Sequence, residues 1–265
     1  MFMNKIKVID NDIDLNINED IKVDVCSNKI TIDVINDTDL EIEYNNLKSD
    51  NDINIHVSEN KILNLFELKQ SNSVNANYNY VLDRNSVLNV VKFYDCNDVI
   101  ESDTVDLNGE YSSVNYTLKT ISNDKQIYNL RLNHNAKNTI SNVTNSGVNI
   151  NGSIDFNVTG YVPNGCKDCE LNQSNRIVTF NNNLCKIDPI LLIDENDVVA
   201  NHAALIGKFN EDELFYLNSR GISYDDAITL LVKGFLLDNL KDERLDKIIE
   251  KYWRWLYASW WFSNA

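Results

Sequence analysis

The sequence predicts a mainly β chain that ends in an α-helical segment, and two periodicities carry this prediction. From about residue 5 to residue 200, polar and apolar residues alternate in short runs, which is typical of strands with one buried face. Clusters of Asn, Asp, Ser and Gly separate the runs, as turns require, and the 265 residues include only two prolines. From residue 210 the apolar residues recur at helical spacing instead.

The strand runs follow one another at roughly even spacing. They are IKVDV (21–25), ITIDV (30–34), LEIEY (40–44), INIHV (53–57), VNANYNY (74–80), VNYTLKT (114–120), IYNLRLN (127–133) and VNINGSIDFNV (148–158). Many short strands fit either a sandwich or barrel, or a parallel β-solenoid whose coils stack on one another. Periodicity alone leaves both open. A solenoid needs caps at its ends, and the helical segment could supply one.

The helical segment divides at a single glycine. Asn210 is a good N-cap, and Glu213 follows three positions later, as in a capping box. Gly221 fits the left-handed position after a first helix, and Ser223 can cap a second helix. A third helix carries one apolar stripe. This stripe consists of Leu245, Ile248, Ile249, Tyr252, Trp253, Leu256 and Trp260.

Charge and cysteine content narrow the class of protein. The net charge of -16 argues against a nucleic-acid partner, because an acidic surface repels phosphate groups. The N-terminal residues lack the apolar core of a secretory signal, and no run of about 20 apolar residues predicts a membrane span. Five cysteines, an odd number, argue against a disulfide framework. We therefore expect a cytoplasmic protein.

One segment matches a family signature. HAALIGKFNEDELFYLNSRGISYDDAITLLVKGF (202–235) resembles the signature of the SufB/SufD family of iron–sulfur cluster assembly proteins. In that family a histidine and small residues lead into an L-F-Y-L-x-S-R-G-I segment and then an A-x-x-L-L-x-x-x-F segment. Two upstream stretches, 146–156 and 174–203, are also similar to family segments. The resemblance covers roughly residues 127–240.

The resemblance implies a fold and a role. The fold is a right-handed parallel β-helix followed by a helical domain, which would place the β-helix core at 1–205 and the helical domain at 206–265. The implied role is that of a scaffold in the SUF system, which binds the ATPase SufC through its helical domain and holds or transfers a nascent iron–sulfur cluster. Such a scaffold is not an enzyme, since the partner ATPase hydrolyses ATP.

The chain also departs from the family pattern. Typical members carry an N-terminal helical region, whereas this chain starts in strands, which suggests a homodimer in place of a SufB–SufD heterodimer. The SufB type has a glutamate after the motif histidine; Ala203 stands there, as in the SufD type. The SufB ligand cysteine falls within IVTFNN, which contains no cysteine, and Cys185 follows a few residues later.

Cys185 and His202 are the candidate cluster ligands, with Cys166 and Cys169 as further candidate metal ligands. Thiolate and imidazole both bind iron. Cys166, Cys185 and His202 follow one another at two similar separations, each slightly below the length of a solenoid repeat, so these residues could form a ladder. The alternative is that the cysteines fill the core and the histidine is hydrogen-bonded. Cys26 and Cys96 follow strand alternation, which indicates core filling.

Four apolar residues are the candidate ATPase contacts, because helical stripes dock into grooves. They are Leu231, Phe235, Ile248 and Ile249. The aromatic stretch 252–262 suits packing against the other helices or a partner. Two other functions stay open: a β-helix enzyme acting on acidic polysaccharide, and a non-catalytic structural β-solenoid. The acidic composition and the missing signal argue against the enzyme.

Overall fold

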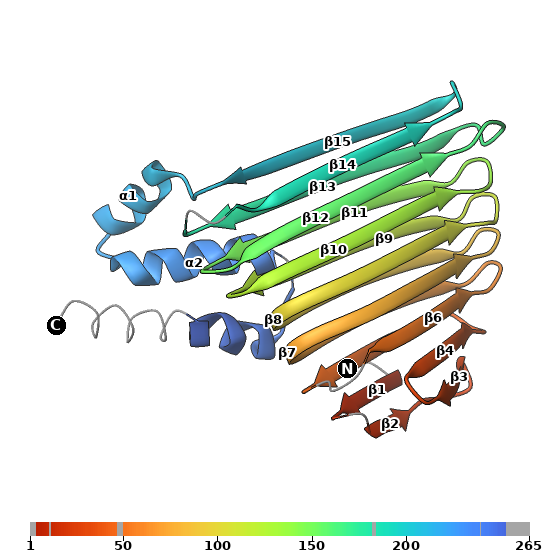
Figure 1. Ribbon diagram of the computed structural model, residues 1–265, viewed down its shortest axis with the longest axis horizontal. Coiled ribbons are helices and arrows are strands. Elements are labelled where there is room, and N and C mark those ends of the chain that lie inside the picture. Colours follow the sequence, from red (N-terminus) through yellow and green to blue (C-terminus); the bar gives the residue numbers. More distant parts are fainter. Residues whose placement is uncertain (1–3, 11, 47–49, 182–183, 239, 253–265) are drawn as a thin grey trace. The chain divides into compact units, whose positions relative to one another are not determined.

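The computed structural model describes residues 4–10, 12–46, 50–181, 184–238 and 240–252. The chain divides into two compact units, Met1–Ile206 and Gly207–Ala265. The first unit is a stack of strands that form a parallel β-solenoid (Figure 1), and the second is helical. The predicted parallel β-helix followed by helices is confirmed, and the sandwich or barrel is excluded.

The strands occupy nearly all of the first unit. They are β1 (Asn4–Ile9), β2 (Asp12–Asn16), β3 (Ile21–Cys26), β4 (Lys29–Val34), β5 (Thr38–Asn45), β6 (Asn51–Val57), β7 (Ile62–Leu82), β8 (Val87–Leu107), β9 (Ser113–Ser122), β10 (Lys125–His134), β11 (Ile140–Asn149), β12 (Ser153–Val162), β13 (Cys169–Thr179), β14 (Lys186–Ile193) and β15 (Val198–Gly207).

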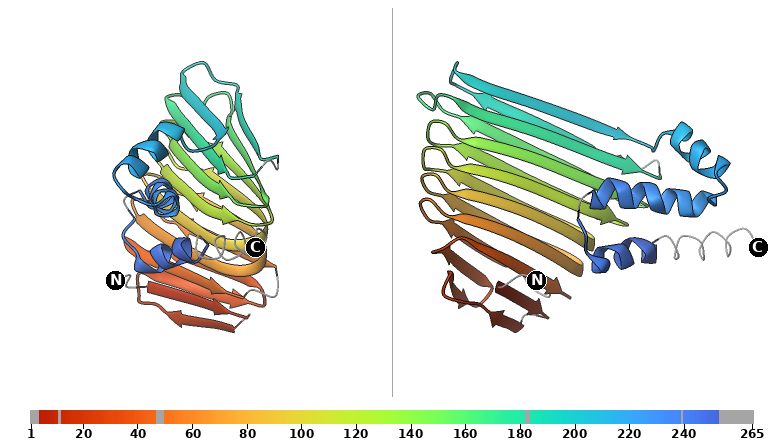
Figure 2. Two further views of the ribbon diagram at one scale, coloured as in Figure 1. Left: turned by 90° about the vertical axis from the view of Figure 1, so that its left-hand side faces the viewer. Right: turned by 180° about the vertical axis from the view of Figure 1, so that it is seen from behind.

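Pairing arranges these strands in two rows. The first row runs β2-β1-β5-β7-β8-β9-β11-β13-β15, and the second runs β3-β4-β6-β7-β8-β10-β12-β14. β7 and β8 each have 21 residues and belong to both rows, because the first half of β7 pairs with β5 and the second half with β6. Alternate residues of both rows point inward; most of the buried apolar ones form one large cluster, and Val162, Cys166, Cys169 and Leu171 form a smaller one. Figure 2 shows the rows from two further sides.

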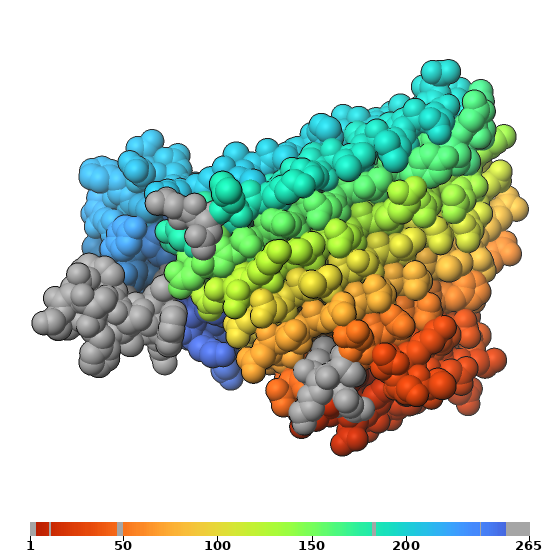
Figure 3. Space-filling model, viewed as in Figure 1, coloured from red at the N-terminus to blue at the C-terminus, as the bar shows by residue number. Residues whose placement is uncertain are grey.

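Register fixes the length of a coil. Leu63 of β7 pairs with Leu88 of β8, and Asp155 of β12 pairs with Lys186 of β14, so the coils lengthen from the middle of the stack toward the last coil. Each coil appears as one band across the face in Figure 3. Outward asparagines stack in register, and each Nδ2 donates to the Oδ1 of the preceding coil at 2.8–3.1 Å. This ladder consists of Asp39, Asn64, Asn89, Asn115, Asn142, Asn172 and Asn201.

The N-terminal end of the solenoid departs from parallel pairing. β2 pairs antiparallel with β1, and β3 pairs antiparallel with β4. The expected β-helix core at 1–205 therefore contains two strands, β2 and β3, that pair antiparallel; period-two alternation could not indicate this, because it carries no information on strand direction. Cys26, at the end of β3, is exposed, so its predicted core role is also wrong, whereas Cys96 is buried as expected.

The helical unit begins with the predicted caps. Asn210 caps α1 (Glu211–Ser219) by accepting from the backbone N–H of Asp212, and Ser223 caps α2 (Tyr224–Leu237) by accepting from that of Asp226. Gly221 has φ +84°, the left-handed conformation that ends α1. Residues 243–252 form a further helix, and the predicted positions from Trp253 onward lie outside the described residues. Within the described part of the chain, none of the helices has the length and hydropathy of a membrane span.

Candidate functional site

His202 lies on the inward face of the last coil. Asn201 donates to Asn172 of β13, and this register sets His202 of β15 beside Gln173. Gln173 points into the core and is 4% exposed. His202 takes the same inward position one coil later but is exposed, because no described strand pairs with the outer edge of β15. The imidazole is thus directed inward and remains accessible.

Cys185 lies in the same last coil, in the other row. It directly precedes β14 and stands beside Ile154 of β12. Its thiol is half-buried against the core and receives a hydrogen bond from Asn149 Nδ2 at 3.2 Å. Burial raises the pKa of the Cys185 thiol, and the hydrogen bonds from Ile154 and Asn149 oppose this only in part. The resting group is therefore a thiol that a metal ion must deprotonate.

The predicted ladder of ligands one coil apart is wrong. Strand register makes the coils longer than the separations between Cys166, Cys185 and His202, so these residues do not return to the same position. Cys185 and His202 instead belong to the two opposite strands of a single coil. Cys185 lies eight residues before the end of β14 and His202 four residues after the start of β15. This offset of four residues corresponds to roughly 13 Å along the strands.

Cys166 and Cys169 lie at the opposite end of the coils from Cys185. Their turn is joined to the β14–β15 turn by the ion pair of Lys167 with Asp197, at 3.0 Å. Both cysteines are buried, and Cys169 Sγ lies 3.2 Å from Thr139 Oγ1. The structure therefore does not bring them to Cys185. Among the described residues, no group of three or more His, Cys, Asp or Glu side chains is arranged to hold a metal ion.

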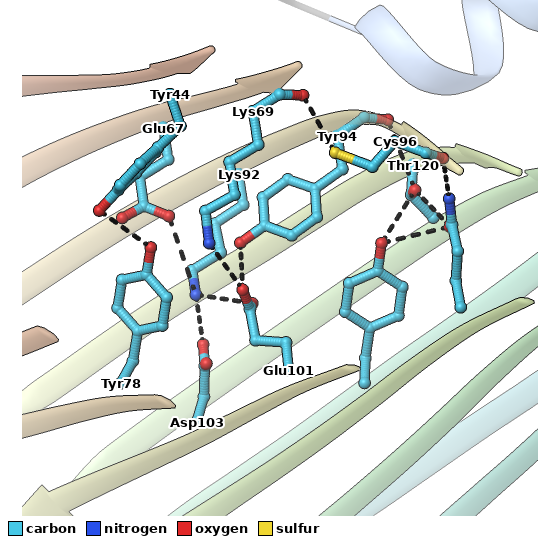
Figure 4. Close-up of polar contacts among 12 residues, drawn as sticks. Tyr44, Glu67, Lys69, Tyr78, Lys92, Tyr94, Cys96, Glu101, Asp103 and Thr120 are labelled. Carbon is cyan, nitrogen blue, oxygen red and sulfur yellow. Dashed lines mark hydrogen bonds and ion pairs between the residues drawn. The ribbon is translucent and has the colours of Figure 1, made fainter. Parts of the chain in front are cut away.

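Five charged side chains inside the solenoid form a cluster that the sequence analysis missed. Glu67, Lys69, Lys92, Glu101 and Asp103, here called the charge cluster, are each at most 3% exposed (Figure 4). They come from β7 and β8, the two long strands that belong to both rows. A signal was present in the sequence, because Glu67 and Lys69 continue the inward phase of Leu63 and Leu65.

Lys92 is at the centre of the charge cluster. Its Nζ lies 2.9 Å from Glu101 Oε1, 2.5 Å from Asp103 Oδ2 and 3.9 Å from Glu67 Oε2. Lys69 Nζ donates to Glu101 Oε2 at 2.9 Å. Tyrosine rings surround both ammonium groups; Lys92 Nζ lies 3.6 Å from the centroid of the Tyr78 ring. Buried charges of this kind are tolerated only when they are paired.

The carboxyl groups of the charge cluster have different proton affinities. Burial alone would raise the pKa of Glu101, but Lys69, Lys92 and the hydroxyl of Tyr94 outweigh it and lower that pKa to about 2. Burial raises the pKa of Asp103 to about 7, because repulsion from Glu101 offsets much of the attraction of Lys92. Burial also raises the pKa of Glu67. Glu101 is thus ionised near neutral pH, whereas Asp103 and Glu67 have pKa values above those of ordinary carboxyl groups.

The predicted partner residues differ in accessibility. Leu231 and Phe235 of α2 are half-buried, and Leu231 lines a surface groove of about 380 Å³ together with Tyr216 and Leu217 of α1. Ile248 and Ile249 are 5% and 0% exposed, so they are not available to a partner on this surface. Among the described residues of the helical unit, the exposed large apolar ones are Phe215, Tyr216, Tyr224 and Leu230.

Comparison with known protein families matches residues 27–235 to the family described as SUF system FeS cluster assembly, SufBD core domain. The match covers the solenoid from β4 onward, α1 and most of α2.

Similar curated proteins carry the same assignment. The iron–sulfur cluster assembly protein SufD of Bacillus subtilis is 39% identical over 82 residues, which are 31% of this chain and 19% of that protein. The SufBD family protein PH1385 of Pyrococcus horikoshii is 46% identical over 61 residues, 23% of this chain and 13% of its own. The SufBD family protein ycf24 of Galdieria sulphuraria is 28% identical over 120 residues, 44% of this chain and 54% of its own. These alignments thus span from about an eighth to about half of the relatives' lengths. The chain belongs to the SufB/SufD family of iron–sulfur cluster assembly proteins.

Proposed function

We propose that this chain is a cytoplasmic scaffold subunit of SUF-type iron–sulfur cluster assembly that holds or transfers a nascent cluster at its last coil. Family membership supports the assembly role. The observation that carries the site is the exposed, inward-facing His202, which shares the last coil with Cys185. Imidazole and thiolate are competent iron ligands, so the site takes iron and sulfide as its cargo.

A second copy completes the ligand set. One chain offers two ligands, whereas clusters usually take four. β14 and β15 have outer edges that no described strand pairs, and β15 carries no charged residue over Val198–Gly207. Uncharged open edges favour pairing with another chain. An isologous contact through this coil would repeat Cys185 and His202 across the axis; because the two residues of one chain are offset by roughly 13 Å along the strands, the cluster would lie between ligands of different copies.

The helical unit binds a SufC-like ABC ATPase, which supplies ATP hydrolysis, while this chain itself is not an enzyme. The groove lined by Tyr216, Leu217 and Leu231 supports this assignment, because Asp212 and Glu213 border it and favour a basic partner surface. Exposed Phe215 and Tyr224 lie on the same two helices and provide aromatic anchors. Leu231 and Phe235 remain candidate contacts, whereas Ile248 and Ile249 stabilise the unit from inside.

The test is anaerobic cluster reconstitution, followed by co-purification with the ATPase. Cys185→Ser and His202→Ala should each lower iron and sulfide content while circular dichroism and ATPase binding stay unchanged. Cys26→Ser is the matched control, since Cys26 is exposed at the other end of the solenoid and should not affect the cluster. Full cluster content in both site variants would show that the site lies elsewhere.

A further inference from the structure

A small cavity lies inside the solenoid next to the charge cluster. It has a volume of about 10 Å³ and is bordered by Asp103 of β8 and Asn145 of β11, together with Leu118, Leu130 and Val158. Glu101, Tyr116, Tyr128 and Asn129 also line it. Asp103 and Asn145 are each 3% exposed. A cavity must offer roughly 10 Å³ and at least two polar partners to hold one water molecule. This cavity meets both requirements.

Asp103 and Asn145 each have one acceptor atom without a hydrogen bond among the described residues. Asp103 Oδ2 receives hydrogen bonds from Lys92 Nζ at 2.5 Å and from the Tyr116 hydroxyl at 2.6 Å, but Asp103 Oδ1 has no hydrogen-bond partner among the described residues. Asn145 Nδ2 donates to Asn175 Oδ1 at 2.8 Å, while Asn145 Oδ1 has no donor in the described part of the chain. Buried acceptors without donors are unfavourable, so two of them on one cavity indicate a missing donor.

We propose that this cavity binds one water molecule that donates its two hydrogens to Asp103 Oδ1 and Asn145 Oδ1. The donor count matches, because water has two O–H groups and the cavity has two unused acceptors. The water also suits both charge states of Asp103, since it can accept a hydrogen bond from a protonated Oδ1 and donate to an ionised one. This water would lie beside Asp103, between the charge cluster and the later strands β10, β11 and β12.

A small cation fits the cavity less well than water. Alkali-metal ions are bound by several oxygens, as other hard cations are, whereas only two unused oxygens border this cavity. The ammonium group of Lys92 is hydrogen-bonded to Asp103 and would repel a second positive charge. The charge cluster contains three carboxyl groups and two ammonium groups, so one proton suffices to balance it.

A crystal structure tests the proposal directly. Crystals grown in a rubidium salt, with anomalous data and a resolution that resolves ordered water, should show one non-anomalous peak within hydrogen-bond distance of Asp103 Oδ1 and Asn145 Oδ1. An anomalous peak at that position would assign the cavity to a cation, and an empty cavity would leave both acceptors unhydrated. Either result would overturn the proposal.

Oxygen-17 magnetic relaxation dispersion tests it in solution. Val158→Ile places one more methylene group in the cavity while both acceptors remain, so the number of long-lived internal waters should fall by one. Val105→Ile is the matched control, because Val105 is equally buried in β8 but does not border the cavity. The same water count in Val158→Ile as in the unchanged chain, or an equal loss in the control, would contradict a water at this position. Neither measurement depends on cluster binding.

Discussion

Polar side chains point inward both in the middle coils and in the last coil, but they are buried in the middle and exposed at the end. In the middle, Lys92 and Glu101 are enclosed by coils on both sides and neutralise each other at 2.9 Å. In the last coil, His202 occupies the inward position but has no described coil beyond it and stays exposed. An inward polar side chain is thus buried and paired where a further coil covers it. In the last described coil, an inward polar side chain stays exposed and can bind a ligand.

The N-terminal end of the solenoid differs from the last coil, because two further strands cover it. There β2 and β3 pair antiparallel, and their apolar residues Ile13 and Val23 pack against the core. These strands also carry charges, such as Asp14 and Lys22, which discourage pairing with another chain. β15 has no described antiparallel strand on its outer edge and carries no charged residue, which supports its assignment as an interface.

The largest effect we predict is a difference in the free energy of unfolding between variants of two inward-facing residues, Lys92 and His202. Lys92→Met should lower the free energy of unfolding by about 3–5 kcal/mol, because it removes the cation paired with buried Asp103 and leaves buried Glu101 with Lys69 alone. His202→Ala should change it by less than about 0.5 kcal/mol, as an exposed position allows. Urea denaturation of both variants measures the difference. Similar losses in the two variants would erase the contrast between the coils.

A second prediction concerns pH. Asp103 has a pKa of about 7 in the folded chain, above its ordinary value, so the folded state holds a proton that the unfolded chain releases near pH 4. The stability that Asp103 contributes is present below about pH 4 and is lost as pH rises to about 7. Relative to Asp103→Asn, the unchanged chain should therefore lose a few kcal/mol over this range, at about 1.4 kcal/mol per pH unit. A constant difference across the range, measured by urea denaturation, would contradict the raised pKa.

A third prediction compares the two ends. Ala204→Asp puts a charge on the open coil and should weaken pairing of two copies about 100-fold, or roughly 2.7 kcal/mol. The matched control is Leu15→Asp on β2, because Leu15 is exposed, as Ala204 is, and this variant should leave pairing unchanged. Sedimentation equilibrium of both variants gives the dissociation constants. If Leu15→Asp weakens pairing and Ala204→Asp does not, the interface is at the N-terminal end.

Local signals were sufficient to predict the elements. Asn210, Gly221 and Ser223 act within one turn of the chain, so the sequence alone indicates where the helices begin and end. Strand existence follows from alternation in the same way. Coil length does not, because it depends on how the turns close, and this is why the predicted ladder from Cys166 to His202 was wrong.

The candidate site could be predicted only in part. The family resemblance selected His202, the spacing along the chain added Cys185, and the structure places both in the last coil. Their offset along opposite strands depends on register, which no single segment encodes. The charge cluster was within reach of sequence reasoning, since charged residues in the inward phase of Leu88 and Val90, such as Lys92, must be buried and paired.

The central claim is that the last coils of two copies together hold the cluster, and one measurement tests it most directly. Iron and acid-labile sulfide are quantified per chain after anaerobic reconstitution of Ala204→Asp, which keeps Cys185 and His202 but should pair about 100-fold more weakly, at a concentration where this variant is a monomer. The account predicts a folded monomer with little or no cluster, beside a full cluster in the unchanged chain. A folded Ala204→Asp monomer that retains full iron and sulfide would contradict it, because one chain would then supply every ligand.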